Sequence, residues 1–186
     1  MPENLRVLDL QSLYSGRIGL TLSEGGHLAE CAAICYHKCG TTISGELRVT
    51  GLHKEVFTLA CPIVTDQMRR TYKDIPEATE YGACGIAALI VEACAELTIL
   101  ARAPKDGGGF DYYLTSLSAG QAIDPENFFD SATARLEVSG ILHGTESQIQ
   151  TRLKQKIEQV ERQPNLLPVY IVIVVFSSSV VRMEQR

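Results

Sequence analysis

The sequence has no apolar run long enough to span a lipid bilayer. Its most apolar stretch, VYIVIVVF over residues 169–176, is far shorter than the roughly 20 residues that a spanning helix needs. The opening segment, MPENLRVLDL, carries charges and lacks an apolar centre, so we expect no secretory signal, no membrane contact and a cytoplasmic location. Internal repeats and low-complexity segments are absent too, and we expect a single domain over residues 1–186.

The paired CxxC spacing that is typical of zinc sites is also missing, although the chain has six cysteines. Without an export signal, free thiols are the expected state. A strong excess of basic residues is absent as well, because the net charge is −5. This balance argues against a protein that coats nucleic acid through bulk electrostatics. It still permits an enzyme that approaches a phosphodiester with carboxylates and a divalent ion, because the ion supplies the positive charge.

Residues 1–73 predict an N-terminal helix followed by a β-hairpin. The glycine-rich stretch 15–26 indicates a loop or loose hairpin, and residues 27–38 indicate a helix that ends near Gly40. Alternating polarity over residues 45–60, with a turn near Leu52–His53, predicts a hairpin that either extends a sheet or forms an interface. Two shorter elements are expected, a strand at 5–10 and a helix at 65–72.

Residues 74–186 predict the order helix, strand, strand, strand, helix, strand. Asp74 and Glu77 resemble a capping box and open a long helix that runs to about Glu96. The small residues of this helix, Gly82 and Gly85 included, would let it press closely on a neighbouring sheet. The remaining elements are strands at 97–103, 108–116 and 134–141, a helix that a capping box opens at Thr145–Gln148, and a buried strand at 168–178.

Two of these strands carry one carboxylate each, Asp111 and Glu137, within otherwise apolar sequence. A charge in an apolar strand costs several kcal/mol unless something offsets it. Two such charges on neighbouring strands therefore suggest a shared cation, usually a hard metal ion with oxygen ligands. The alternative is a pair of carboxylates at the rim of the sheet that point into water.

The element order and the two carboxylates resemble the αβββαβ core of the PD-(D/E)XK, or restriction-endonuclease-like, nuclease superfamily over residues 74–178. The resemblance implies an α/β fold with a mixed central sheet flanked by helices. It also implies Asp111, Glu137 and an acidic residue of the first helix as ligands of Mg²⁺ or Mn²⁺. Glu80 is the favoured third ligand, because Glu77 is better explained as part of the helix cap.

The sequence departs from that family at the motif lysine, where Ser139 stands. Lys156 on the following helix lies beside its apolar stripe and could lean along the core edge toward the carboxylates. The alternative is a surface lysine with its amine in water. Five basic residues could contact backbone phosphates, namely Arg102, Lys105, Arg135, Arg152 and Lys156.

Two functions follow from the resemblance. The first is a Mg²⁺-dependent endonuclease that hydrolyses DNA in bacterial defence or DNA processing, with Asp111, Glu137, Lys156 and Glu80 as catalytic residues. The second is an inactive nuclease-like subunit that binds a protein partner or forms a homo-oligomer within a larger bacterial complex. The missing motif lysine favours the second function, and three suitably placed acidic residues favour the first.

Two other groups of residues carry potential ligands. His27, Cys31 and Cys35 recur at a spacing of four on one helix, but ligands from one helix face do not close a tetrahedron, so a core role is expected. His143 follows the Glu137 strand, where it is either a proton shuttle or merely exposed.

Overall fold

The computed structural model describes residues 5–41, 44–104, 109–116, 123–124, 127–162 and 167–186. Helices and strands follow the order expected from the sequence, with one strand more at the C-terminal end. The strands are β1 (Arg6–Asp9), β2 (Ser44–Gly51), β3 (Glu55–Ala60), β4 (Thr98–Arg102), β5 (Tyr112–Thr115), β6 (Ala134–Ile141), β7 (Val169–Val175) and β8 (Val180–Gln185). The helices are η1 (Leu10–Ser15), α1 (Leu22–Lys38), α2 (Asp66–Thr71), α3 (Ile75–Ala95), η2 (Phe128–Ser131) and α4 (Glu146–Glu161), where η marks 3₁₀ turns.

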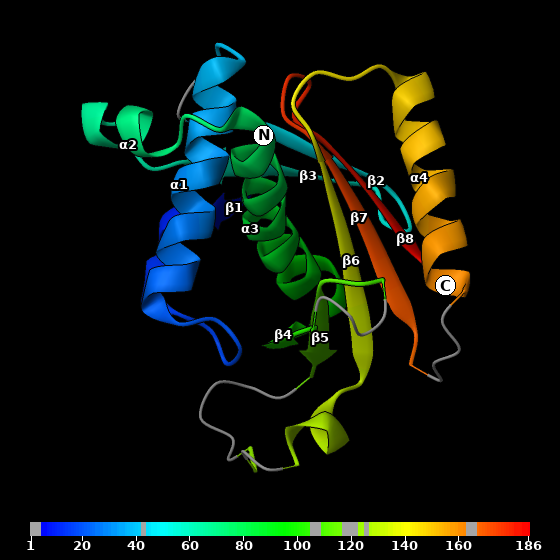
Figure 1. Cartoon of the computed structure of the whole chain (residues 1–186). Coiled ribbons are helices and arrows are strands. Elements are labelled where there is room, and N and C mark those ends of the chain that lie inside the picture. The colour runs from blue at the N-terminus through cyan, green and yellow to red at the C-terminus, as the bar shows by residue number, and fades with distance from the viewer. Residues whose placement is uncertain (1–4, 42–43, 105–108, 117–122, 125–126, 163–166) are drawn as a thin grey trace.

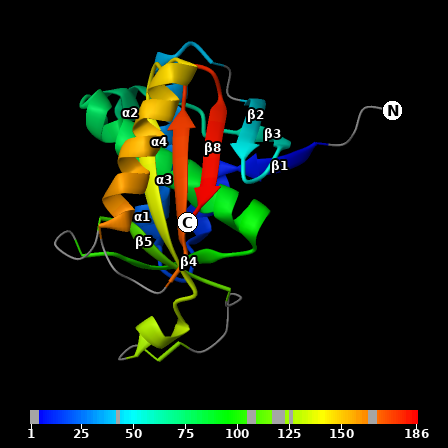
Figure 2. The same ribbon diagram turned by 90° about the vertical axis from the view of Figure 1, so that its right-hand side faces the viewer.

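Eight strands of the described residues form one mixed sheet in the order β1-β3-β2-β8-β7-β6-β5-β4. The predicted hairpin, β2 and β3, is antiparallel and extends this sheet. It does so through β8, which the sequence reading did not anticipate and which pairs with β2 on one side and β7 on the other. Figure 2 shows β8 running between β7 and the hairpin. The last strand thus joins the N-terminal elements to the β4–β7 half of the sheet.

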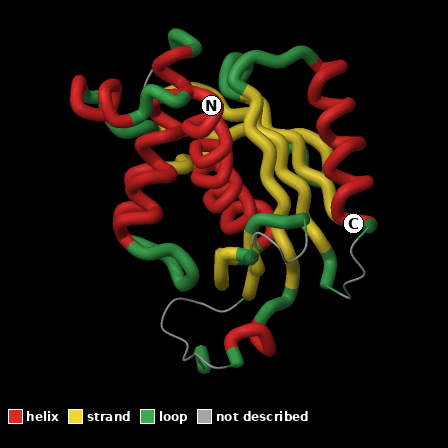
Figure 3. Tube along the Cα trace, in the orientation of Figure 1, coloured by secondary structure: helices red, strands yellow, loops and turns green. Residues whose placement is uncertain are grey.

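Helices cover both faces of the sheet, as predicted. α1 and α3 lie on one face and α4 lies on the other (Figures 1 and 3). The alternation of β7 shows how one strand serves both layers: Val172 and Val174 join the core under α1 and α3, whereas Ile171 and Ile173 pack with α4. Glu137 of β6 is the register partner of Ile171, so the Glu137 side chain faces α4.

The prediction of a loop over residues 15–26 was wrong for its second half, because α1 begins at Leu22. The side chain of Thr21 accepts a hydrogen bond from the Glu24 N–H and caps the helix there. Gly25 and Gly26 therefore lie inside a helix, where both are buried. Their composition indicated a turn, but packing of α1 on η1 and α3 outweighs their weak helix propensity.

α3 packs on the sheet at β6, as expected, but its glycines Gly82 and Gly85 face α1. A Cβ atom at Gly82 would lie 2.8 Å from the backbone of Ala32 in α1, so only glycine allows this approach. The expectation that no segment is long and apolar enough to span a bilayer was wrong for α3, which alone among the described helices has that length and composition, yet 61% of its most apolar window is buried inside the protein. Such burial is typical of the core helix of a soluble domain.

Candidate functional site

Asp111 lies immediately before β5, at the point where that strand stops pairing with β6. Its backbone N–H donates to the Leu136 carbonyl over 2.8 Å. Its carboxylate Oδ2 accepts a hydrogen bond from the N–H of Val138 at 2.7 Å. The side chain thus satisfies a β6 donor that no backbone carbonyl of β5 reaches, which fixes the carboxylate against the edge of the sheet.

The free edge of β6 beyond Val138 is approached by the first turns of α3. A Cβ atom at Gly140 would lie only 2.2 Å from the carbonyl oxygen of Thr79, so helix and strand touch through their backbones. This contact places the N-terminal part of α3, with Glu80, on the opposite side of the strand end from α4. The space between the two helices becomes a cavity with the carboxylates in its wall.

Lys156 of α4 forms a hydrogen bond and ion pair with Oε1 of Glu137. The Glu137 side chain is only 2% exposed and that of Lys156 is 19% exposed. Of the two readings of Lys156, the structure therefore supports the one in which the lysine leans inward to the carboxylates. Asp111, Glu137 and Lys156 come from three separate elements and meet at one place.

Gln159 belongs to this cluster and was missed in the sequence. Its Nε2 donates to the Gly109 carbonyl at 2.9 Å and to Oε1 of Glu137 at 3.3 Å. Its Oε1 accepts from the Lys156 amine at 3.4 Å. The spacing could have revealed it, because a residue three positions after Lys156 lies on the same face of the helix.

Both carboxyl groups favour the protonated form more than usual. Burial, followed by the charge of Asp111, raises the pKa of Glu137 to about 7, although contact with Lys156 opposes this shift. Burial also raises the pKa of Asp111, against the opposing effects of the Val138 N–H and Lys156. The neighbouring Asp111 carboxyl raises the pKa of Glu137, whereas the influence of Glu137 lowers that of Asp111, so Glu137 favours the protonated form more than Asp111 does.

Two adjoining cavities open beside these groups, with volumes of about 540 Å³ and about 330 Å³. Glu80, Cys84, Asp111 and Lys156 line both of them, so the cavities meet at the carboxylates. The smaller cavity is also lined by Glu137. The cluster is therefore buried on one side and borders the two cavities on the other.

The predicted set of three metal ligands is only partly assembled. Glu80 lines both cavities, but within the described part of the chain no three His, Cys, Asp or Glu side chains are placed to hold one ion together. The expected convergence of Glu80 with the other two carboxyls was thus wrong for this conformation, because Glu80 is exposed on α3 across the cavity. Two carboxylates remain, and two suffice for Mg²⁺, which keeps several water ligands.

The remaining sequence candidates line neither cavity. Cys31 and Cys35 are buried in the core, as expected, and burial raises the pKa of both thiols to about 12. His27 packs between the rings of Tyr72 and Tyr81, with centroid separations of 5.6 Å and 4.8 Å. His143 is exposed.

The five predicted phosphate contacts have different surroundings. Arg102 lines the smaller cavity, Arg152 lines the larger one, and Lys156 lines both. Arg135 is buried, with its guanidinium bonded to the Leu167 carbonyl, so it is not placed to contact a phosphate. Lys105 lies outside the described residues.

Comparisons of the chain with models of protein families, with curated proteins and with solved structures found no match. The site must therefore be interpreted from its own geometry.

Proposed function

We propose that the protein is a metal-dependent phosphodiesterase of the PD-(D/E)XK-like type that acts on DNA in the cytoplasm. The observation that carries this proposal is the meeting of Asp111, Glu137 and Lys156, from three elements, at a cavity. The element order α3-β4-β5-β6-α4-β7, with Asp111 immediately before the second strand and Glu137 on the third, agrees with the resemblance drawn from the sequence.

Asp111 and Glu137 are the residues that would hold Mg²⁺ or Mn²⁺, with water molecules as the remaining ligands. A bound ion supplies a more acidic water molecule and neutralises charge on the phosphate. Hydrolysis forms a bond from a water oxygen to phosphorus and breaks the bond to one sugar oxygen, which takes up a proton. Glu137 would bind the ion in its deprotonated form, so its raised pKa would make metal binding weaker at lower pH.

Ser139 stands at the position of the motif lysine and carries no charge, so Lys156 supplies the positive charge instead. Its amine contacts Glu137 and borders both cavities, so a small shift along its flexible stem would carry it to a phosphate oxygen. Gln159 holds both the amine and the backbone at Gly109, which steadies the segment that leads into Asp111. The lysine of this site thus comes from the helix after the Glu137 strand.

A second function, that of an inactive scaffold subunit in an assembly with a protein partner or further copies of the chain, is favoured by one observation. The Lys156 amine contacts the Glu137 carboxylate directly, and among the described residues no third acidic ligand accompanies Asp111 and Glu137. With the Lys156 ammonium group in place of a metal ion, the same cluster would serve as a structural ion pair.

A cleavage assay separates the two functions. Linear and plasmid DNA are incubated with the protein and Mg²⁺ or Mn²⁺, with chelator as a blank. We expect metal-dependent cleavage that falls on the order of 100-fold in Asp111→Asn, Glu137→Gln and Lys156→Met, since each removes a group in contact with the reacting phosphate or its ion. Lys154→Met is the matched control, because Lys154 is exposed on the same helix and lines neither cavity.

Calorimetry with Mn²⁺ completes the test. The nuclease should bind the ion, and Asp111→Asn should weaken that binding by about tenfold or more. If the protein neither cleaves DNA nor binds Mn²⁺, while the three site variants retain its oligomeric state, the scaffold function replaces the nuclease.

A further inference from the structure

The two cavities differ in the chemistry of their walls. The larger one runs between the first turn of α3 and α4, where Arg152 and Lys156 lie one helical turn apart on the same wall. The smaller one runs past α3 toward β4 and β5, where Tyr81, Phe110 and Arg102 contribute to its lining. One side thus offers positive charge, and the other offers aromatic surface with a cation beside it.

The carboxylates where the cavities meet are recessed. Glu137 is 2% exposed at its side chain, and Asp111 is fixed to the edge of the sheet by the Val138 N–H. An intact duplex is a stiff cylinder with its phosphates on the surface and its paired bases behind them. Such a cylinder would be held at the rim of the cavities, and its phosphates would not reach the recessed carboxylates. A single strand bends at every nucleotide, and its unpaired bases are free to enter a cavity.

The smaller cavity fits one such base. Its volume of about 330 Å³ lies at the lower end of the range for small-molecule pockets, roughly 300–1,000 Å³. Tyr81 forms part of its wall, and the Arg102 guanidinium lies 5.7 Å from the centre of that ring. Aromatic rings and arginine are the groups that proteins use to stack bases without selecting a sequence.

We propose that the substrate is single-stranded nucleic acid that passes through both cavities. Its scissile phosphate lies at Asp111 and Glu137, a neighbouring base enters the smaller cavity against Tyr81, and the next phosphate on the other side lies near Arg152. The proposal rests on the proposed function for the position of the phosphate, and it adds the strandedness and the base site.

Binding tests the proposal without requiring cleavage. Fluorescence anisotropy compares an oligothymidylate of about twelve nucleotides, within the range of single-strand sites, with a hairpin duplex of similar length, in Ca²⁺. We expect the single strand to bind at least tenfold more tightly. Tyr81→Leu should weaken that binding about tenfold, because it removes a stacking surface, whereas Tyr81→Phe keeps the ring and should bind normally.

Arg102→Gln is a second variant, since Tyr81 also contacts His27 and its replacement could loosen α3. It should weaken binding severalfold, because it removes the cation beside the base. Equal or tighter binding of the duplex, no binding of either DNA, or normal binding by Tyr81→Leu would each overturn the proposal. Tight single-strand binding without cleavage would instead remove the proposed function alone, and equal cleavage of duplex would remove only the strand preference.

Discussion

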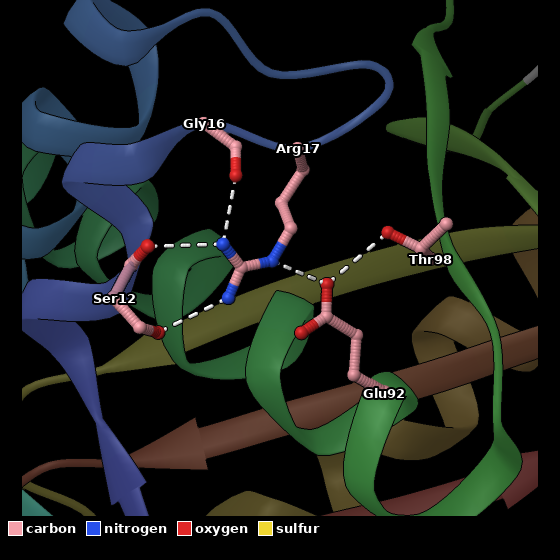
Figure 4. A network of polar contacts seen from close by, with 5 residues as sticks. All are labelled: Ser12, Gly16, Arg17, Glu92 and Thr98. Atoms are coloured by element: carbon pink, nitrogen blue, oxygen red, sulfur yellow. Dashed lines mark hydrogen bonds and ion pairs between the residues drawn. The ribbon is translucent and has the colours of Figure 1, made fainter. Parts of the chain in front are cut away.

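The molecule holds two partly buried clusters of charge that are built on opposite principles. In the first, Arg17 donates to Glu92 at 2.6 Å, to the carbonyls of Ser12 and Gly16 at 2.9 Å and 2.7 Å, and to the Ser12 hydroxyl at 3.0 Å (Figure 4). Thr98 donates to the same Glu92 oxygen. Each guanidinium nitrogen therefore has a partner, and the cluster ties the segment after η1 to α3 and β4.

The cluster of Asp111, Glu137 and Lys156 is balanced differently. Two acidic groups share one lysine, and burial raises the pKa of both carboxyls. Cavities adjoin this cluster, whereas the Arg17 guanidinium is enclosed by protein partners. The comparison teaches that a satisfied network stabilises a fold, while a cluster of two carboxyl groups and one lysine with space beside it is suited to a ligand.

The largest effect on stability is expected at Arg17. Arg17→Met keeps most of the side-chain volume, but it leaves Glu92 with the Thr98 hydroxyl and no cation, and it removes the donor to the Ser12 and Gly16 carbonyls. The free energy of unfolding should fall by about 3 kcal/mol, since the pair is partly buried and several charge-assisted hydrogen bonds are lost. Urea denaturation followed by circular dichroism measures the change.

Arg17→Lys is the matched control for this prediction. Lysine keeps the charge but has no planar fork to reach Glu92 and the Ser12 and Gly16 carbonyls together, so an intermediate loss is expected. A loss below about 1 kcal/mol in Arg17→Met would mean that the network is not a principal anchor of the segment after η1.

A smaller change in the free energy of unfolding, this time an increase, is expected when Glu137 is replaced. Its pKa is raised from 4.5 to about 7, so between those values the folded protein keeps a proton that the unfolded chain has lost. This group therefore contributes stability at pH 4.5 that is lost as the pH rises through about 7. Glu137→Gln lacks this loss, and it should exceed the wild type in stability by about 1–3 kcal/mol at pH 8 while matching it near pH 4.5.

Thermal or urea denaturation across that pH range measures the difference between the two proteins. Glu158→Gln, an exposed position on the same α4, controls for the loss of a negative charge. If Glu137→Gln is less stable than the wild type at pH 8, the ion pair with Lys156 outweighs burial, and the cluster resembles that of Arg17 after all.

Much of the fold could be predicted from the sequence because the local sequence patterns agreed with one another. The caps at Asp74 and Thr145, the stripe of α4 and the apolar run of β7 each fixed an element that packing then confirmed. The start of α1 and the whole of β8 were not readable. Gly25 and Gly26 have weak helix propensity, and β8 gains its position from pairing with β2, more than 100 residues away in sequence.

The individual residues of the site could be predicted from the sequence, but the way they come together could not. Asp111 and Glu137 stood out as charges in apolar strands, and the phase of α4 pointed to Lys156. Whether that amine reaches Glu137 depends on how α4 packs on β6 and β7, which no local pattern sets. The position of Glu80 across the cavity depends likewise on how closely α3 packs on β6 at Gly140.

The smallest effect is expected at the exposed pair of Arg48 and Glu46 on β2. Their separation of 2.7 Å is almost that of the Arg17–Glu92 pair, but their side chains are 59% and 53% exposed. Water screens both charges in the folded and unfolded chain, so Glu46→Gln should change the free energy of unfolding by less than about 0.5 kcal/mol. Urea denaturation in parallel with Arg17→Met makes the comparison direct. If the two variants lose similar stability, distance would rank the ion pairs of this protein; if they differ as expected, burial and the number of satisfied donors do.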